Sequence, residues 1–235
     1  MNKLFKNGTI VTASDMIRAD LLVEGETIKQ IGVGMDETGL EVIDANGKYL
    51  LPGGIDPHTH FDLPMFNTVS SDDHYTGSKA AAFGGTTTVM DFIGLENNDF
   101  QRSFESWRAL TEKSAVDHSA HMNLTHFDDD LARQLPGLAA NGITTLKVFT
   151  AYNGRLRLDD GSIFKALLAA RESGMLVMAH CENGDVIEQL VPKALAAGHT
   201  SPAWHAYTRP KWGAVESSLR MAAMRLCETL PGFLF

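Results

Sequence analysis

The chain has 235 residues, a formal net charge of -9 and 44% hydrophobic residues, an ordinary composition for a folded globular protein. The acidic balance argues against a nucleic-acid partner, which would need a basic face. The two cysteines, Cys181 and Cys227, are too few for a disulfide framework, and we expect a cytoplasmic protein. The sequence contains neither an apolar signal-peptide core at its start nor a run long enough to span a membrane.

Residues 1–48 contain a series of short β-strand patterns. Residues 9–12 are rich in β-branched side chains, and residues 19–23 and 27–31 flank a turn at Glu24-Gly25, which is typical of a β-hairpin. Residues 41–47 predict another strand and turn. We interpret residues 1–48 as the N-terminal part of a small β-sandwich domain, which needs a second element to pack against.

Residues 49–235 alternate between strand and helix patterns, which predicts parallel β/α units in a second domain. Strands are expected at 49–55, 86–92, 118–125, 143–149 and 175–180, helices at about 72–83, 100–114, 128–140, 162–173, 185–197 and 214–229, and the start of a sixth strand at 232–235. An open doubly wound sheet and a (β/α)8 barrel are both compatible with this alternation.

Polar residues at strand ends favour the barrel. His58, His60, Lys147 and His180 lie at or just beyond the C-terminal ends of the first, fourth and fifth strands. In a barrel these ends converge on one mouth, where active sites are found, whereas an open sheet would spread them apart.

The first of these residues form the pair His58-Thr59-His60. Residues i and i+2 of an extended strand point to the same side, so the two imidazoles can reach one metal ion. Pro52 and Gly53-Gly54 allow a tight backbone before the pair, and Asp56 is placed to orient a ligand. A bare His-x-His pattern alone is also compatible with two unrelated loop residues.

Lys147 lies at the end of a strand that we expect to be buried, where a charged amine is costly. One interpretation is a lysine whose amine extends to solvent at the barrel mouth. The other is a neutral amine that takes up carbon dioxide as a carbamate, an anionic oxygen ligand that can bridge two metal ions. Such a binuclear centre would activate water and polarise a carbonyl group.

The chain resembles the N-terminal half of the dihydropyrimidinase and D-hydantoinase family of the amidohydrolase superfamily. The matching stretches are 51–60 (LPGGIDPHTH), 80–88 (AAAFGGTTT), 147–152 (KVFTAY), 179–185 (AHCENGD) and 205–210 (HAYTRP) followed by Glu216. The resemblance covers nearly the whole chain and implies an amidohydrolase-type (β/α)8 TIM barrel.

The resemblance also implies the roles of individual residues. His58 and His60 would hold the more buried metal, carboxylated Lys147 would bridge two metals, and His180 would hold the second. Tyr152 would hydrogen-bond the substrate carbonyl. The cofactors would be two divalent ions, zinc with manganese or cobalt as substitutes, together with the carbamate. The substrate would be a small cyclic ureide, a dihydropyrimidine or 5-substituted hydantoin opened at its cyclic amide bond, and the full-length form a homo-oligomer, a tetramer.

The sequence departs from the family pattern at its C-terminal end. The family carries a further histidine ligand at the sixth strand and an aspartate base at the eighth, and neither is present before Phe235. We therefore expect a chain truncated after about five β/α units, assign it no catalytic base, and expect no activity from it alone. The alternatives are an allantoinase-like or dihydroorotase-like enzyme, or a non-catalytic fragment or scaffold. We expect His74 and His199 at the surface and a structural role for His121.

Overall fold

The computed structural model describes residues 2–65 and 67–229. It consists of two compact units, Met1–Gly54 and Ile55–Phe235. The placement of a domain boundary after residue 48 stays a prediction. Among the described residues, no helix is both long enough and apolar enough to span a membrane.

The first unit contains one five-stranded sheet in its described part, with the order β3-β2-β1-β4 and β5 beside β1. Its strands are β1 (Lys3–Val11), β2 (Met16–Glu24), β3 (Thr27–Gly32), β4 (Glu41–Asp44) and β5 (Tyr49–Leu50). The predicted hairpin is confirmed as the antiparallel pair β2 and β3. Leu4 and Ile10 of β1 are buried in the small core of this sheet.

The second unit alternates strands and helices, as the sequence predicted. Its elements are β6 (Gly54–Asp56), β7 (Pro64–Met65), β8 (Thr68–Val69), α1 (His74–Phe83), β9 (Thr86–Ile93), α2 (Phe100–Thr111), β10 (Asp117–Asn123), α3 (Asp129–Ala140), β11 (Thr145–Phe149), α4 (Asp160–Glu172), β12 (Leu176–His180), α5 (Gly184–Ala196), α6 (Ala203–Tyr207) and α7 (Lys211–Thr229). The predicted strand at 232–235 lies outside the described residues.

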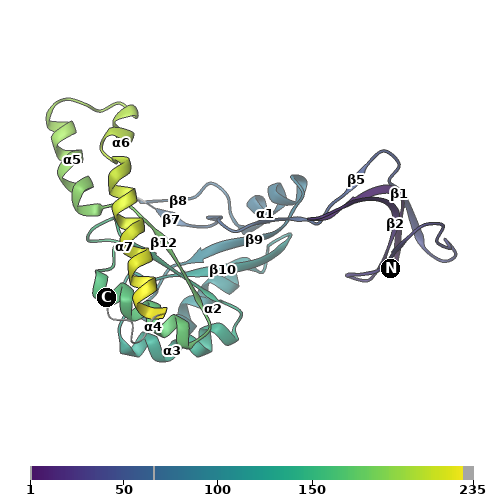
Figure 1. The fold of residues 1–235 in the computed structure, drawn as a ribbon, viewed down its shortest axis with the longest axis horizontal. Coiled ribbons are helices and arrows are strands. Elements are labelled where there is room, and N and C mark those ends of the chain that lie inside the picture. The colour runs from purple at the N-terminus through teal and green to yellow at the C-terminus, as the bar shows by residue number, and fades with distance from the viewer. Residues whose placement is uncertain (1, 66, 230–235) are drawn as a thin grey trace. The chain divides into compact units, whose positions relative to one another are not determined.

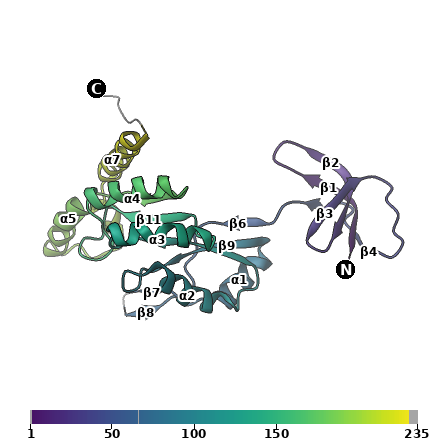
Figure 2. The ribbon, with the colours of Figure 1, turned by 90° about the horizontal axis from the view of Figure 1, so that it is seen from below.

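The main sheet of this unit has the order β12-β11-β10-β9-β6, and β9 to β12 pair in parallel. The strands follow one another in chain order without the reversal that defines a doubly wound sheet. Helices α2, α3 and α4 lie on one side of it (Figure 1), and in the view from below they lie in front of the strands (Figure 2). This arrangement confirms the predicted barrel-type fold, with five of its strands in the described sheet.

Alternate residues along each strand point to opposite faces of the sheet, one packed against the helices and the other facing the candidate site. Ala120 and Met122 of β10 and Leu146 and Val148 of β11 join the buried cluster under helices α2, α3 and α4. The residues between them point to the opposite face of the sheet. That face carries Lys147, so the strand pattern itself aims the lysine away from the helices.

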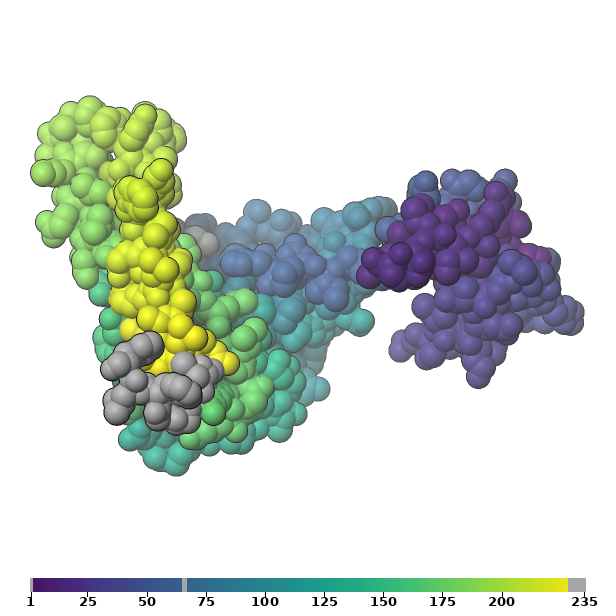
Figure 3. Space-filling model, in the orientation of Figure 1, coloured from purple at the N-terminus to yellow at the C-terminus, as the bar shows by residue number. Residues whose placement is uncertain are grey.

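Helix α7 continues the helical layer. Its Met221 and Met224 pack against the same core, and Arg220 forms an ion pair with Asp160 at the start of α4. The outward face of α7 exposes Trp212 and Leu219, and the helix crosses the visible face of this unit as a continuous ridge (Figure 3).

One predicted strand is wrong in its extent. The sequence predicted a single first barrel strand over 49–55, but Tyr49–Leu50 pairs with β1 in the first unit and only Gly54–Asp56 joins the barrel-type sheet. Pro52 has no backbone N–H to donate to a sheet, and it lies in the break between these two strands.

Candidate metal centre

Strand β6 delivers the His58-Thr59-His60 segment to the edge of the sheet. Thr59, between the two histidines, is buried and anchored: its backbone N and its Oγ1 both donate to the carbonyl oxygen of Met90, at 2.9 and 3.0 Å. The two imidazoles therefore stand on the other side of the segment. Their ring centroids are 5.1 Å apart, and both rings pack on Phe92, at 4.5 Å for His58 and 4.8 Å for His60.

Both histidines are held in the form that binds metals. Burial, together with the neighbouring His60 and Lys147, lowers the pKa of His58. Burial also lowers the pKa of His60, although the negative charge of Asp91 partly offsets the effect. Neutral imidazole has a free ring lone pair at neutral pH, which a divalent cation requires. Asp56 contributes to the geometry by accepting a hydrogen bond from the backbone N of His58 at 3.0 Å.

Lys147 of β11 is the charged residue that the sequence marked as costly to bury, and it is only 8% exposed. Its Nζ lies 5.7 Å from the ring centroid of Phe92 and 5.3 Å from that of Phe149. Burial lowers the pKa of this amine. No carboxylate among the described residues forms an ion pair with Nζ. Lys147 thus lies between two aromatic rings with its protonated form disfavoured.

The ring of Phe149 lies near the other two predicted site residues, His180 and Tyr152. The ring of His180, at the end of β12, lies 6.0 Å from that of Phe149 and 5.2 Å from that of Tyr152. His180 Nε2 lies 2.7 Å from an oxygen of Glu182, and that carboxylate also faces Arg209 at 3.7 Å. The structure thus places His180 and Tyr152 beside each other. On the adjacent strand β11, His180 pairs with Phe149, and Lys147 lies two residues before Phe149 on the same face.

Tyr152 has an unusual backbone. Its φ is 66°, in the left-handed region that residues other than glycine rarely adopt. The carbonyl of Tyr152 accepts hydrogen bonds from the backbone N of Arg155 and of Leu156, both at 3.0 Å, which stabilises this conformation. Burial, followed by the charge of Glu182, raises the pKa of the phenol, so the hydroxyl stays protonated and can donate a hydrogen bond. Strained residues of this kind often lie at functional sites.

The donor set fits a metal centre only if Lys147 takes part. Within residues 2–65 and 67–229, no cluster of three or more histidine, cysteine, aspartate or glutamate side chains has the spacing to hold a metal ion. What the fold brings together is the pair His58 and His60 on one side of Lys147 and His180 on the other. An anionic ligand built on Lys147 would connect the two sides, and imidazole and oxygen ligands suit zinc and related cations.

One histidine that the sequence analysis did not assign to the site lies on the same face of the sheet as Phe92. His121 is buried; its Nε2 donates to the carbonyl of Pro57 at 2.9 Å and its Nδ1 contacts the hydroxyl of Thr145. It therefore holds the residue before His58. The structural role expected for His121 stays a prediction.

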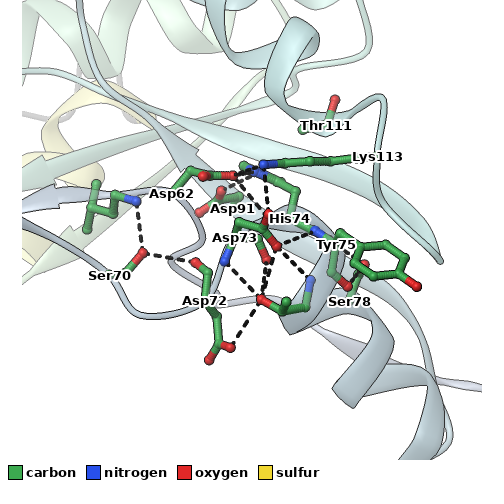
Figure 4. Close-up of polar contacts among 12 residues, drawn as sticks. Asp62, Ser70, Asp72, Asp73, His74, Tyr75, Ser78, Asp91, Thr111 and Lys113 are labelled. Carbon is green, nitrogen blue, oxygen red and sulfur yellow. Dashed lines mark hydrogen bonds and ion pairs between the residues drawn. The ribbon is translucent and has the colours of Figure 1, made fainter.

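The expected surface position of His74 is wrong, because its ring is buried between Asp62 and Asp91 (Figure 4). The local sequence gave only a weak signal for this burial, namely the acidic neighbours Asp72 and Asp73. The side chains that enclose His74 come from other segments of the chain.

Comparison with known proteins places these residues in a family context. A family model described as "Amidohydrolase family" matches residues 41–179. The D-hydantoinase of Geobacillus stearothermophilus is 49% identical over 213 residues, which cover 89% of this chain and 45% of that protein. The D-hydantoinase of Streptomyces coelicolor is 38% identical over 232 residues, which cover 96% of this chain and 49% of that protein. The crystal structure of the dihydropyrimidinase from Brevibacillus agri matches with a TM-score of 0.94 at 45% identity, over 97% of this chain and 50% of that one. The chain spans about half the length of the curated relatives it matches.

Proposed function

The chain belongs to the amidohydrolase family, whose members are metal-dependent, and from that premise we propose that the protein hydrolyses the cyclic amide bond of dihydropyrimidines or 5-substituted hydantoins. The observation that carries the proposal is the position of Lys147 between the His58-His60 pair and His180. The similarity to D-hydantoinases and to a dihydropyrimidinase supports the choice of a cyclic ureide as substrate.

The residues present fit two divalent ions, with zinc as the proposed metal and manganese or cobalt as substitutes. His58 and His60 would hold one ion and His180 the other. When bound, the ions supply an activated water and polarise the carbonyl that is attacked. For His180 to serve as a ligand through Nε2, Glu182 must release the contact that it now makes with that nitrogen.

Lys147 would supply the bridge between the ions. The lone pair of its neutral Nζ forms a bond to the carbon of carbon dioxide, and the nitrogen releases one proton, which leaves an anionic carbamate. Burial without a carboxylate partner favours the neutral amine that this reaction requires. The carbamate would replace this neutral amine with an anionic oxygen ligand for the ions that the histidines hold.

Tyr152 would orient the substrate. Its hydroxyl stays protonated at neutral pH and lies on the His180 side of Lys147, where it can donate to the ring carbonyl and to the oxyanion that develops there. The described residues do not assign a general base, so the proton transfers of the reaction are not assigned to this chain.

The experiment measures metal binding and ring opening separately. The 235-residue chain is loaded with Zn²⁺ in bicarbonate buffer, and its metal content is measured beside that of a His58→Ala/His60→Ala variant. Ring opening of dihydrouracil and of a 5-substituted hydantoin is then followed by chromatography and mass spectrometry on the complete, metal-loaded protein. We expect metal that depends on the two histidines and an N-carbamoyl product. A metal-loaded complete protein that leaves both rings intact would overturn the proposal.

A further inference from the structure

Helix α1 begins with a buried histidine that lies between two carboxylates. The side chain of His74 is 2% exposed; its Nδ1 lies 2.7 Å from Asp62 Oδ2 and its Nε2 lies 3.0 Å from Asp91 Oδ2 (Figure 4). The second contact is an ion pair whose angle falls outside the range of a good hydrogen bond. A histidine ring between two carboxylates is favoured in its protonated form, the imidazolium, because both neighbours carry negative charge when ionised.

A second cation lies close to this group. Lys113 lies on the far side of Asp62, with Nζ 3.2 Å from Asp62 Oδ2 and 3.0 Å from Asp73 Oδ2. Asp73 in turn caps α1 by accepting hydrogen bonds from the backbone N of Tyr75 and Thr76. The His74 ring and the Lys113 ammonium thus both contact carboxylates. Asp73, which contacts Lys113, also caps the first turn of α1, so these residues are attached to the start of that helix.

Both carboxylates that His74 contacts adjoin the candidate metal centre. Asp62 is two residues after His60 in the chain. Asp91 directly precedes Phe92, and the ring of Phe92 packs against the rings of His58 and His60. Strand alternation turns Asp91 toward the helices and Phe92 toward the site. His74 therefore joins the segment after His60 to the strand beneath it, from the side of the sheet opposite the metal site.

Two backbone hydrogen bonds also connect the segment after His60 to the start of α1. The backbone N of His74 also donates to Asp62 Oδ2, at 3.0 Å, and the backbone N of Asp62 donates to the carbonyl of Asp72, at 3.0 Å. Asp62 is thus held at its side chain and its backbone by the start of α1. The segment from His60 to Asp62 has little freedom to move independently of this helix.

We propose that His74 is a positioning residue of the metal centre: by bridging Asp62 and Asp91, it holds His60 over Phe92 so that His58 and His60 present their nitrogens to one ion. This inference rests on the proposed function, because it assumes that His58 and His60 bind a metal. Residues behind the ligands of metal sites fix ligand orientation, and their loss typically lowers metal affinity by about 10- to 100-fold.

The test measures cobalt binding to the full 235-residue chain. Co²⁺ is titrated into the wild type, a His74→Gln variant and a matched His126→Gln control, and its visible absorption is recorded. His126 also contacts an aspartate, Asp128 at 2.9 Å, but it is exposed and lies in the loop before α3. We expect His74→Gln to bind Co²⁺ about 10-fold more weakly or worse, with an altered spectrum, and the control to match the wild type.

Co²⁺ affinity and the absorption spectrum are measured on protein that circular dichroism shows to be folded. A change in either therefore reports altered positioning of the ligand histidines and not a loss of stability. If His74→Gln does not fold, Asp62→Asn weakens the same bridge at a partly exposed position, and we expect a several-fold loss of affinity. Affinity within twofold of the wild type in the folded variant would overturn the inference. Absence of histidine-dependent Co²⁺ binding in the wild type would instead overturn the proposed function.

Discussion

Phe61, the residue after His60, lies directly against Gly77 of helix α1. A Cβ placed on Gly77 would come within 2.1 Å of Phe61 Cε1 and 2.4 Å of Cδ1, distances that no packed pair of carbons adopts. The absence of a side chain at Gly77 therefore allows the His60-Phe61-Asp62 segment to lie flat on the helix. Phe61 and His74 thus attach the same segment to α1, one by packing and the other by charge.

Gly77→Ala should therefore destabilise the protein although alanine favours helices. We expect a loss of about 1 to 3 kcal/mol in the free energy of unfolding, because the added methyl group displaces the Phe61 ring. Gly137→Ala in helix α3 is the matched control, since a Cβ there meets nothing within 4 Å and should stabilise the helix by up to about 1 kcal/mol. Urea unfolding measures both, and equal effects of the two substitutions would contradict the packing argument.

The His74 bridge should make stability depend on pH. Burial opposes protonation of the ring, but the close contacts with Asp91 and Asp62 and the negative charges of these two groups outweigh it, and the pKa of His74 is raised above its ordinary 6.5. Because the folded state binds this proton more tightly than the unfolded state, the stabilisation is complete below pH 6.5 and is lost as the pH rises through the raised pKa.

We therefore expect the stability advantage of the wild type over His74→Gln to shrink as the pH rises above about 6.5 and through the raised pKa. The change should be about 1.4 kcal/mol for each unit by which folding raises the pKa. Urea unfolding of both proteins across this range, at constant ionic strength, provides the measurement. A difference that stays constant with pH would show that His74 does not carry its charge in the folded protein.

Lys147→Met should separate function from stability. The substitution replaces a buried amine, which lacks a carboxylate partner among the described residues, with an apolar side chain of similar length. We expect the metal-free protein to gain on the order of 1 kcal/mol in unfolding free energy, because the cost of burying a polar amine disappears. We also expect the metal content after loading in bicarbonate buffer to fall to at most one ion per chain, since a bridging ligand is lost.

Chemical denaturation and elemental analysis of the same preparations test both parts of the Lys147→Met prediction. A variant that is less stable by more than about 1 kcal/mol would indicate that the lysine makes structural contacts. A variant that still binds two ions would show that no carbamate is needed.

Tyr152→Phe should lower activity without lowering stability. The side chain is 42% exposed, so losing its hydroxyl should change the unfolding free energy by less than about 0.5 kcal/mol. If the hydroxyl stabilises the developing oxyanion, kcat of the complete protein should fall by about 100-fold. Tyr207→Phe, at a position that is 70% exposed, is the control and should retain full kcat. A kcat of Tyr152→Phe near that of the wild type would exclude the proposed role.

The order of strands and helices was accessible from local patterns because each β/α unit is built from neighbouring residues. The alternation of apolar runs and amphipathic stretches placed α1 to α4 and β9 to β12 within a few residues of their observed bounds. It failed at residues 49–55, where the same apolar run serves two sheets. Partner choice between strands depends on distant residues, so periodicity alone could not divide this run.

The sequence by itself determined the residues of the proposed site: a pair of histidines two residues apart, a lysine near the end of a strand and a histidine at a strand end. These follow from the chemistry of each side chain and the twofold repeat of a strand. The tertiary structure alone decided what lies around them. It placed Lys147 between the rings of Phe92 and Phe149, and it buried His74 between Asp62 and Asp91. These contacts join segments that are apart in the chain, and only the packing of helix α1 and the parallel strands brings them together.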